Sequence, residues 1–339
     1  MNEFLKGILD GINTLFNNYG WSIIVFTILI KVILLPFDYK SRVSMRKTTK
    51  IQPKLNELQK KYKDDQAKLN AKMSELYKKE GINPLSSCLP LLLTFPVLLA
   101  MFGAMRTVAN EQLVQQAFDI LLGNEPVLEN WLWIKNLWMP DSPFAAAWPD
   151  LNSLNMITAD IWQKVIAAMP AETLATLTET VQSSTGVLIS AESFASNLKG
   201  SVEAVYQAMA ATPSYIEHVS TLPGWNFNLI ITTVSVMRDF NGWFLLPLMS
   251  AGSQFLMSNM TQPAANAQQT EQQKSTGNFM KWFFPLFTLW LCFSYTAAFA
   301  LYWVASNLIA IVQNWGINKY LDAKEQKASA NVQAEGKIK

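Results

Sequence analysis

The chain has 339 residues, half of them hydrophobic, and it carries 19 Phe and 12 Trp at a formal net charge of only +2. The apolar residues are gathered in long blocks, which is typical of a polytopic membrane protein and predicts an all-α fold. The sequence has no P-loop, metal-ligand cluster, nucleophile–base pair or paired intramembrane carboxylates. We therefore predict a protein that is not an enzyme and that holds no cofactor or metal. Cys88 and Cys292 lie in apolar segments and are predicted to be small packing residues.

The chain begins with an amphipathic segment, residues 1–19. Phe4, Ile8 and Ile12 recur at helical spacing with polar residues between them, which predicts an interfacial helix on the membrane surface. The segment lacks the pattern of a cleavable signal peptide and the arginines of an organelle transit peptide. We therefore expect a multi-pass protein of a bacterial plasma membrane.

A single charge interrupts the first long apolar run. Residues 20–37 are about long enough to cross a bilayer as transmembrane helix 1, and they contain Lys31. A lysine at the bilayer centre costs about 2.5 to 3.5 kcal/mol, so Lys31 is a candidate functional residue. Alternatively, its side chain reaches the headgroups, because Phe37 at the end of the run lies only about 9 Å further along a helix. Rotation by 100° per residue places Lys31 in one stripe with Thr27 and Asp38, which favours a polar neighbour.

Residues 38–83 hold 13 Lys or Arg and six Asp or Glu, which predicts a cytoplasmic location. Apolar residues at three- and four-residue spacing on both sides of Asp64-Asp65 predict a helical hairpin. We expect Pro53 to start the first arm, one of the two aspartates to cap the second, and Gly81 to end it. The lysines on its outside form either a solvated face or a surface for anionic lipid headgroups or ribosomal RNA.

Transmembrane helix 2, residues 84–106, precedes a long segment of opposite charge. Residues 107–240 hold four Lys or Arg and 13 Asp or Glu, so we place them on the extracytoplasmic side. Helix-like patches predict a small inserted helical region at about 141–221. The lone His218 lies in a polar stretch without evident partners and is interpreted as a surface residue. Residues 227–236 are too short to span a bilayer and are predicted to pack or to lie at the interface.

Three more spans complete a predicted membrane domain of five helices. The third span carries a polar stripe, and in the last span Asn307 shares one face with other polar residues. Only Ser294-Tyr295 separates the last two spans, which predicts a tight antiparallel hairpin. The loop charges place the N-terminus outside and the C-terminus in the cytoplasm. The segments are transmembrane helix 3 at 241–260, a flexible cytoplasmic loop at 261–278, transmembrane helices 4 and 5 at 279–293 and 296–316, and a disordered cytoplasmic tail at 317–339.

The polar stripes on three spans predict a hydrophilic groove. Polar side chains in hydrocarbon turn toward one another or toward water, so striped helices that pack together enclose a wetted concavity. An alternative, strongest for the third span taken alone, is that its serines only form a helix contact surface. The candidate groove residues are Lys31, Thr27, Gln254, Ser258, Tyr302, Trp303, Ser306 and Asn307.

A succession of short motifs resembles one known family. The motifs occupy residues 22–36, 51–54, 76–78, 83–85, 88–92, 95–96, 301–304 and 306–308. In this order and combination they closely resemble those of the YidC/Oxa/Alb membrane protein insertases, over about residues 20–106 and 241–318. Each motif alone would be a weak signal.

The resemblance implies five helices around a groove that is open to the cytoplasm and the lipid, beside a cytoplasmic hairpin that receives substrates. It implies insertion of nascent membrane proteins, alone or beside the Sec translocon, with ribosomes and membrane lipids as partners and no DNA. Tyr302 and Trp303 would contact the hydrophobic segment of the substrate, and the groove cation would attract acidic residues. The family usually has Arg in place of Lys31 and a far shorter outer loop, so residues 141–221 look inserted.

Two other functions remain open from the residues themselves. An ion or small-solute transporter would use Lys31 as a coupling site, and it predicts an internal repeat or intramembrane carboxylates, which the sequence lacks. A structural assembly factor would chaperone membrane proteins without inserting them.

Overall fold

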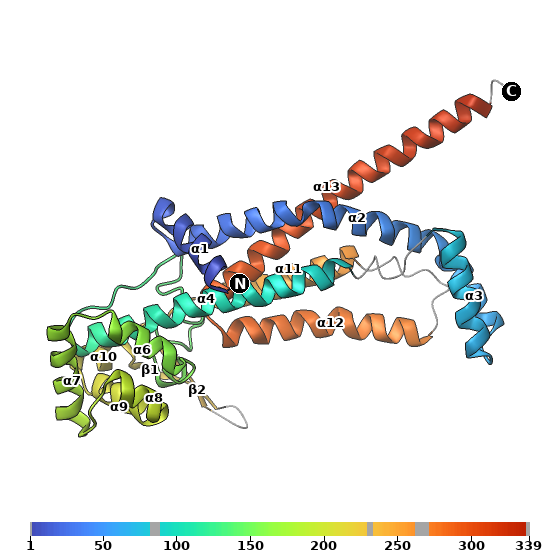
Figure 1. The fold of residues 1–339 in the computed structure, drawn as a ribbon. Coiled ribbons are helices and arrows are strands. Elements are labelled where there is room, and N and C mark those ends of the chain that lie inside the picture. The colour runs from blue at the N-terminus through green and yellow to red at the C-terminus, as the bar shows by residue number, and fades with distance from the viewer. Residues whose placement is uncertain (1, 82–88, 229–232, 262–270, 337–339) are drawn as a thin grey trace. The chain divides into compact units, whose positions relative to one another are not determined.

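The computed structural model describes residues 2–81, 89–228, 233–261 and 271–336, and these are mostly helical, as predicted (Figure 1). Two helices in this part of the chain, residues 19–61 and 297–327, are long and apolar enough to cross a membrane by length and composition. The chain divides into two compact units. Unit 1 contains residues 1–26, 100–250 and 288–303, and unit 2 contains residues 27–99, 251–287 and 304–339.

Unit 1 begins with the predicted amphipathic helix, α1 (Asn2–Phe16). Leu5 and Leu9 are buried on one side, whereas Phe4 and Leu15 are exposed. The unit further contains residues 19–26 of α2 (Tyr19–Lys61), 100–121 of α4 (Leu89–Leu121), 245–250 of α11 (Leu245–Thr261), 288–294 of α12 (Glu271–Ser294) and 297–303 of α13 (Ala297–Gly336). The helix α12 ends at Ser294 and α13 begins at Ala297, so the predicted break between the last two spans is confirmed. Their packing as a tight antiparallel hairpin stays a prediction. The packing role of Cys292 is consistent with its complete burial as a free thiol, whereas Cys88 lies outside the described residues.

Residues 141–221, which the sequence predicts to be inserted and which we call the insertion, are mostly helical and fold around an aromatic core. Trp162 and Phe194 stack with ring centroids 4.7 Å apart, and Phe118 of α4 packs on Trp162 at 5.7 Å. This core attaches the insertion to α4, and Figure 1 shows its helices gathered in one cluster. The helices are α5 (Leu151–Asn155), α6 (Ala159–Ala167), α7 (Ala171–Thr185), α8 (Ala191–Ser196), α9 (Leu198–Ala210) and α10 (Pro213–His218).

A two-stranded antiparallel sheet, which the sequence analysis did not predict, follows these helices. In it, β1 (Thr221–Asn228) pairs with β2 (Thr233–Met237), and Phe227 lies opposite Val234. The register is irregular between Thr221 and Asn226, where Gly224 adopts a φ of +81° that glycine tolerates best. Within the predicted packing segment 227–236, residues 227–228 and 233–236 are strand, and the β-branched Thr233, Val234 and Val236 favour a pleated backbone.

Two buried asparagines connect the segment after α4 to the segment before α11. The backbone N–H of Asn136 donates to Asn241 Oδ1 at 2.8 Å, and Asn241 Nδ2 donates back to Asn136 O at 2.9 Å. Asn136 Nδ2 also donates to Gln116 Oε1 on α4 at 2.9 Å. Since buried amides are costly unless paired, this network fixes the backbone around both asparagines.

The prediction that His218 lacks partners is wrong. Its Nδ1 lies 2.9 Å from Asp239 Oδ2, and its ring stacks on Trp148 at a centroid distance of 4.2 Å. Lys135 forms a salt bridge with the same carboxylate. Burial alone would raise the pKa of Asp239, but the hydrogen bonds from Lys135 and His218 outweigh it and lower the pKa. These partners are distant in sequence, so the local pattern could not identify them.

Unit 2 contains the predicted helical hairpin. Ile51 and Leu55 of α2 are buried against Met73, Leu76 and Tyr77 of α3 (Gln66–Lys79). The N-cap and C-terminal predictions for α3 are confirmed, because Asp65 accepts a hydrogen bond from the Lys68 backbone at 2.9 Å and Gly81 has a φ of +61°. The expected start at Pro53 is wrong, since Pro53 lies inside the continuous helix α2.

The remaining parts of unit 2 are residues 89–99 of α4, 251–261 of α11, 271–287 of α12 and 304–336 of α13. Residues 84–88 of the predicted second span and 262–270 of the predicted loop lie outside the described residues. The rest of that loop, from Glu271, is helical. The predicted disorder of the tail is also wrong, because α13 continues to Gly336. Salt bridges from Arg46 to Asp322 at 2.7 Å and from Lys50 to Glu325 at 3.1 Å support this extension.

Candidate functional site

Lys31 lies on α2 among exposed apolar residues of unit 2 and is itself half-buried. Its backbone carbonyl accepts a hydrogen bond from Gln313 Nε2 of α13 at 3.0 Å. Asp38, which the stripe predicted to share its face, interacts with it electrostatically. No salt bridge of the Lys31 ammonium is formed with any described residue. Asp38 is therefore the carboxylate that the structure places near the Lys31 charge.

Asn307 connects the polar stripes of α11 and α13. Its Nδ2 donates to Ser253 Oγ at 3.1 Å and to Gln254 Oε1 at 3.2 Å. The pairing of two polar stripes inside apolar segments is the packing expected of membrane helices, because an unpaired amide is expensive in hydrocarbon. The structure thus brings together two predicted site residues, Gln254 and Asn307.

Arg42 is a site residue that the sequence analysis missed. It is only 8% exposed, and its Nε donates to Asn314 Oδ1 of α13 at 2.8 Å. Asn314 Nδ2 in turn contacts Met257 Sδ of α11 at 3.4 Å. A signal was present, because Arg42 follows Asp38 by four residues and continues the stripe of Lys31. It was instead counted among the surface charges of the cytoplasmic hairpin.

We call the residues joined by these bonds the polar cluster. It combines the buried guanidinium of Arg42 with neutral amides and one hydroxyl from α2, α11 and α13, and Lys31 belongs to it through its backbone carbonyl. Asp38 interacts electrostatically with both Lys31 and Arg42. Such polar groups can offer hydrogen bonds to a polar segment. Within the described residues, no group of three or more His, Cys, Asp or Glu side chains is placed to hold a metal ion. The polar cluster consists of Lys31, Arg42, Ser253, Gln254, Asn307, Gln313 and Asn314.

The other predicted site residues are Thr27, Ser258, Ser306, Tyr302 and Trp303. In unit 2, Thr27 is buried, whereas Ser258 and Ser306 are half-buried. Tyr302 and Trp303 belong to unit 1, where Tyr302 is buried and the ring of Trp303 packs at 5.6 Å from Phe299. Their assignment as substrate contacts stays a prediction.

Apolar helices with a polar cluster, beside a basic helical hairpin, define the class as an integral membrane protein. The sequence matches the model of the 60Kd inner membrane protein family over residues 11–196 and 202–325. The chain belongs to this family, which is the YidC/Oxa/Alb family that its motifs resemble. The match includes most of the insertion as well as the segments predicted to span the membrane.

Curated relatives support the same assignment. The membrane protein insertase YidC of Helicobacter pylori is 48% identical over 102 residues, which are 29% of this chain and 19% of the relative. That of Fusobacterium nucleatum is 43% identical over 107 residues, 32% of this chain and 52% of the relative. That of Chlorobaculum tepidum is 26% identical over 323 residues, 95% of this chain and 36% of the relative. This chain therefore spans between about a fifth and about half of the length of these relatives.

Proposed function

We propose that this chain is a membrane protein insertase of a bacterial plasma membrane. The observation that carries the proposal is the polar cluster, which joins three helices within and at the end of apolar segments of a chain from this family. A stable soluble core would not need two cations and several amides there. A groove that lowers the cost of moving polar groups through hydrocarbon does need them.

In the proposed mechanism, a hydrophobic substrate segment contacts Tyr302 and Trp303 and partitions into lipid. Its short polar tail enters the hydrophilic groove, which Thr27, Ser258 and Ser306 line together with the polar cluster. Lys31 attracts acidic residues of this tail, each of which would otherwise cost about 2.5 to 3.5 kcal/mol at the bilayer centre. The membrane potential contributes about 2.3 kcal/mol per charge for each 100 mV. No covalent bond changes.

The topology and partners belong to the same proposal. Five spans, with the N-terminus outside and the C-terminus inside, place the basic α2–α3 hairpin in the cytoplasm. There it receives nascent membrane proteins from the ribosome and contacts lipid headgroups. The chain acts alone or beside the Sec translocon.

Reconstitution of the purified full chain in liposomes tests this function against its rivals. We expect a nascent single-span substrate to become protease-protected while the vesicles remain tight to small solutes. Solute flux without protected substrate would support a transporter that uses the intramembrane Lys31. Soluble, protease-sensitive substrate held by the chain would support an assembly factor. Either of these results would contradict the insertase proposal.

A further inference from the structure

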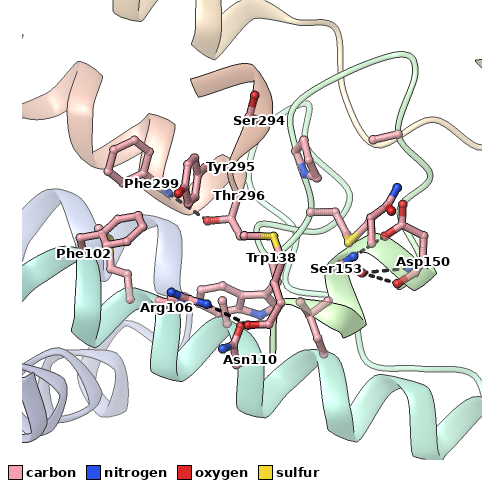
Figure 2. Close-up of a pocket in the computed structure, with 18 of the residues that line it drawn as sticks. Phe102, Arg106, Asn110, Trp138, Asp150, Ser153, Ser294, Tyr295, Thr296 and Phe299 are labelled. Atoms are coloured by element: carbon pink, nitrogen blue, oxygen red, sulfur yellow. Dashed lines mark hydrogen bonds between the residues drawn. The ribbon is translucent and has the colours of Figure 1, made fainter. Parts of the chain in front are cut away.

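A pocket in unit 1, outside the polar cluster, is lined by polar and aromatic side chains that have no role in the proposed insertion mechanism. Its volume is about 250 Å³. Figure 2 shows Phe102, Arg106 and Asn110 on α4 along one side, and Asp150 and Ser153 at α5 on the opposite side. The turn between α12 and α13 and the start of α13 form a third wall. The pocket is therefore held by helices from both the membrane segments and the insertion.

The walls of this pocket are mainly apolar and aromatic. Phe102 packs edge-on against Tyr295 and Phe299, with ring centroids 5.2 and 5.3 Å away. Leu113 and Phe144 extend the apolar lining. Ligand pockets of proteins commonly measure about 300 to 1,000 Å³, so this one fits part of an amphiphile rather than a whole lipid.

Hydrogen-bond donors point to the kind of group that the pocket takes. Trp138 lines the pocket and is 1% exposed, yet its Nε1–H has no hydrogen-bond partner within the described residues. An indole N–H can only donate, and leaving it unpaired when buried costs about 1 to 3 kcal/mol. The side-chain amide of Asn110, also buried, adds a second donor to the same lining. The pocket thus favours a ligand with acceptor oxygens.

Arg106 gives the pocket its positive charge. Its side chain is exposed and donates one hydrogen bond, from NH2 to Met156 O at 2.8 Å, and it forms no salt bridge with a described residue. The guanidinium has five N–H donors, so most of them remain for an anion. The carboxylate of Asp150, in contrast, already accepts the Ser153 backbone N–H at 2.8 Å and caps α5. The charges of Arg106 and Asp150 cancel in sum, but the exposed guanidinium can pair with an anionic group at its own end of the pocket.

We propose that this pocket binds the glycerophosphate and first acyl carbons of a membrane phospholipid. The phosphate pairs with Arg106, an ester carbonyl accepts from Trp138 Nε1 and Asn110, and the acyl chain begins along Phe102 and Phe299. Phospholipid is the amphiphile that surrounds any membrane protein and that combines an anionic group, acceptor carbonyls and an apolar chain. Charge complementarity and the apolar walls together favour it over a free anion or an acidic peptide.

The test uses the full chain in non-ionic detergent, delipidated and titrated with a photoactivatable phosphatidylglycerol. Cross-linked peptides are mapped, and binding is measured by native mass spectrometry. We expect labels within residues 102–113 and 138–145. We expect Arg106→Gln to bind about tenfold more weakly and Trp138→Phe about fivefold more weakly, as loss of a charged and of a neutral hydrogen bond predicts.

Three controls keep the result specific. Arg238→Gln removes an exposed arginine of the same unit outside the pocket and should bind like the wild type. Ala145→Phe keeps every hydrogen-bond donor but fills the pocket, so it should lose the site-specific label. It tests the site independently of Trp138→Phe, which could fail to fold. Inorganic phosphate alone should not compete at the same concentration. Equal binding by wild type, Arg106→Gln and Ala145→Phe, competition by phosphate, or labels confined to other peptides would each overturn the proposal.

Discussion

Arg42 on α2 and Asn314 on α13 form a buried hydrogen bond of 2.8 Å between Nε and Oδ1, so a charged side chain of one helix is held by a neutral amide of another. The two residues are 272 positions apart in the chain. An unpaired amide oxygen is costly when buried, so removing Arg42 would leave Asn314 in an unfavourable buried position.

Replacing Arg42 should therefore destabilise the protein through Asn314. We expect Arg42→Met to lower the free energy of unfolding by about 1 to 3 kcal/mol, because the Asn314 oxygen loses its donor. Thermal unfolding in detergent measures this, with Lys40→Met, an exposed lysine of the same helix, as the matched control. The double variant Arg42→Met with Asn314→Leu should regain most of the loss. Equal stability of Arg42→Met and Lys40→Met would contradict this account.

Asp141 fixes the start of α11 in unit 1. Its fully buried carboxylate accepts the backbone N–H groups of Leu246 at 2.6 Å and Phe244 at 3.1 Å. In Asp141→Asn the amide NH2 would face one of these backbone N–H donors. We therefore expect the free energy of unfolding to fall by about 1 to 3 kcal/mol. The exposed Asp160→Asn should change little. Hydrogen exchange of the first turn of α11 should rise only in Asp141→Asn, and unchanged exchange there would refute the capping role.

The contacts of Asp239 predict a pH dependence of unit 1. Hydrogen bonds from Lys135 and His218 hold the pKa of Asp239 below its usual range even though burial opposes them. The carboxylate therefore contributes stability above its unfolded pKa of about 3.9, and this contribution is lost as pH falls through the lower folded pKa. Asp239→Asn should be less stable than wild type at pH 7, and the difference should disappear in strong acid.

Unfolding followed by near-ultraviolet circular dichroism at several pH values measures this difference. Glu172→Gln, which changes an exposed carboxylate of α7, provides the control and should follow the wild type throughout. A difference for Asp239→Asn that stays constant from neutral to acid pH would argue against the ionic contribution.

Elements with strong local signals were predictable from the sequence. The apolar run around Lys31, the helix cap at Asp65 and the positive φ of Gly81 each follow from composition or spacing within a few residues. The same holds for the helical character of the insertion, which contains α6 and α9. Such signals depend on one face or one turn of a helix, so no tertiary contact is needed to read them.

What the sequence did not predict depends on contacts between distant segments. The helical tail forms salt bridges with Arg46 and Lys50 of α2, and these partners are absent from any local window. The sheet of β1 and β2 is short, so part of it, within residues 227–236, was interpreted as an apolar packing segment. Arg42 was not predicted as a site residue for another reason. It lies in a segment rich in lysine, so a buried arginine was interpreted as a surface charge.

Among the residues of the polar cluster, Lys31 is the one whose charge the proposed mechanism needs most directly. The decisive measurement is the insertion efficiency of single-span substrates into proteoliposomes by wild type, Lys31→Arg and Lys31→Ala, each with an acidic and with a neutral tail. We predict that Lys31→Ala inserts the acidic-tailed substrate about three- to tenfold less efficiently, equivalent to about 0.7 to 1.4 kcal/mol. The neutral-tailed substrate and Lys31→Arg should remain near wild type. Undiminished insertion of the acidic tail by Lys31→Ala would contradict the electrostatic account.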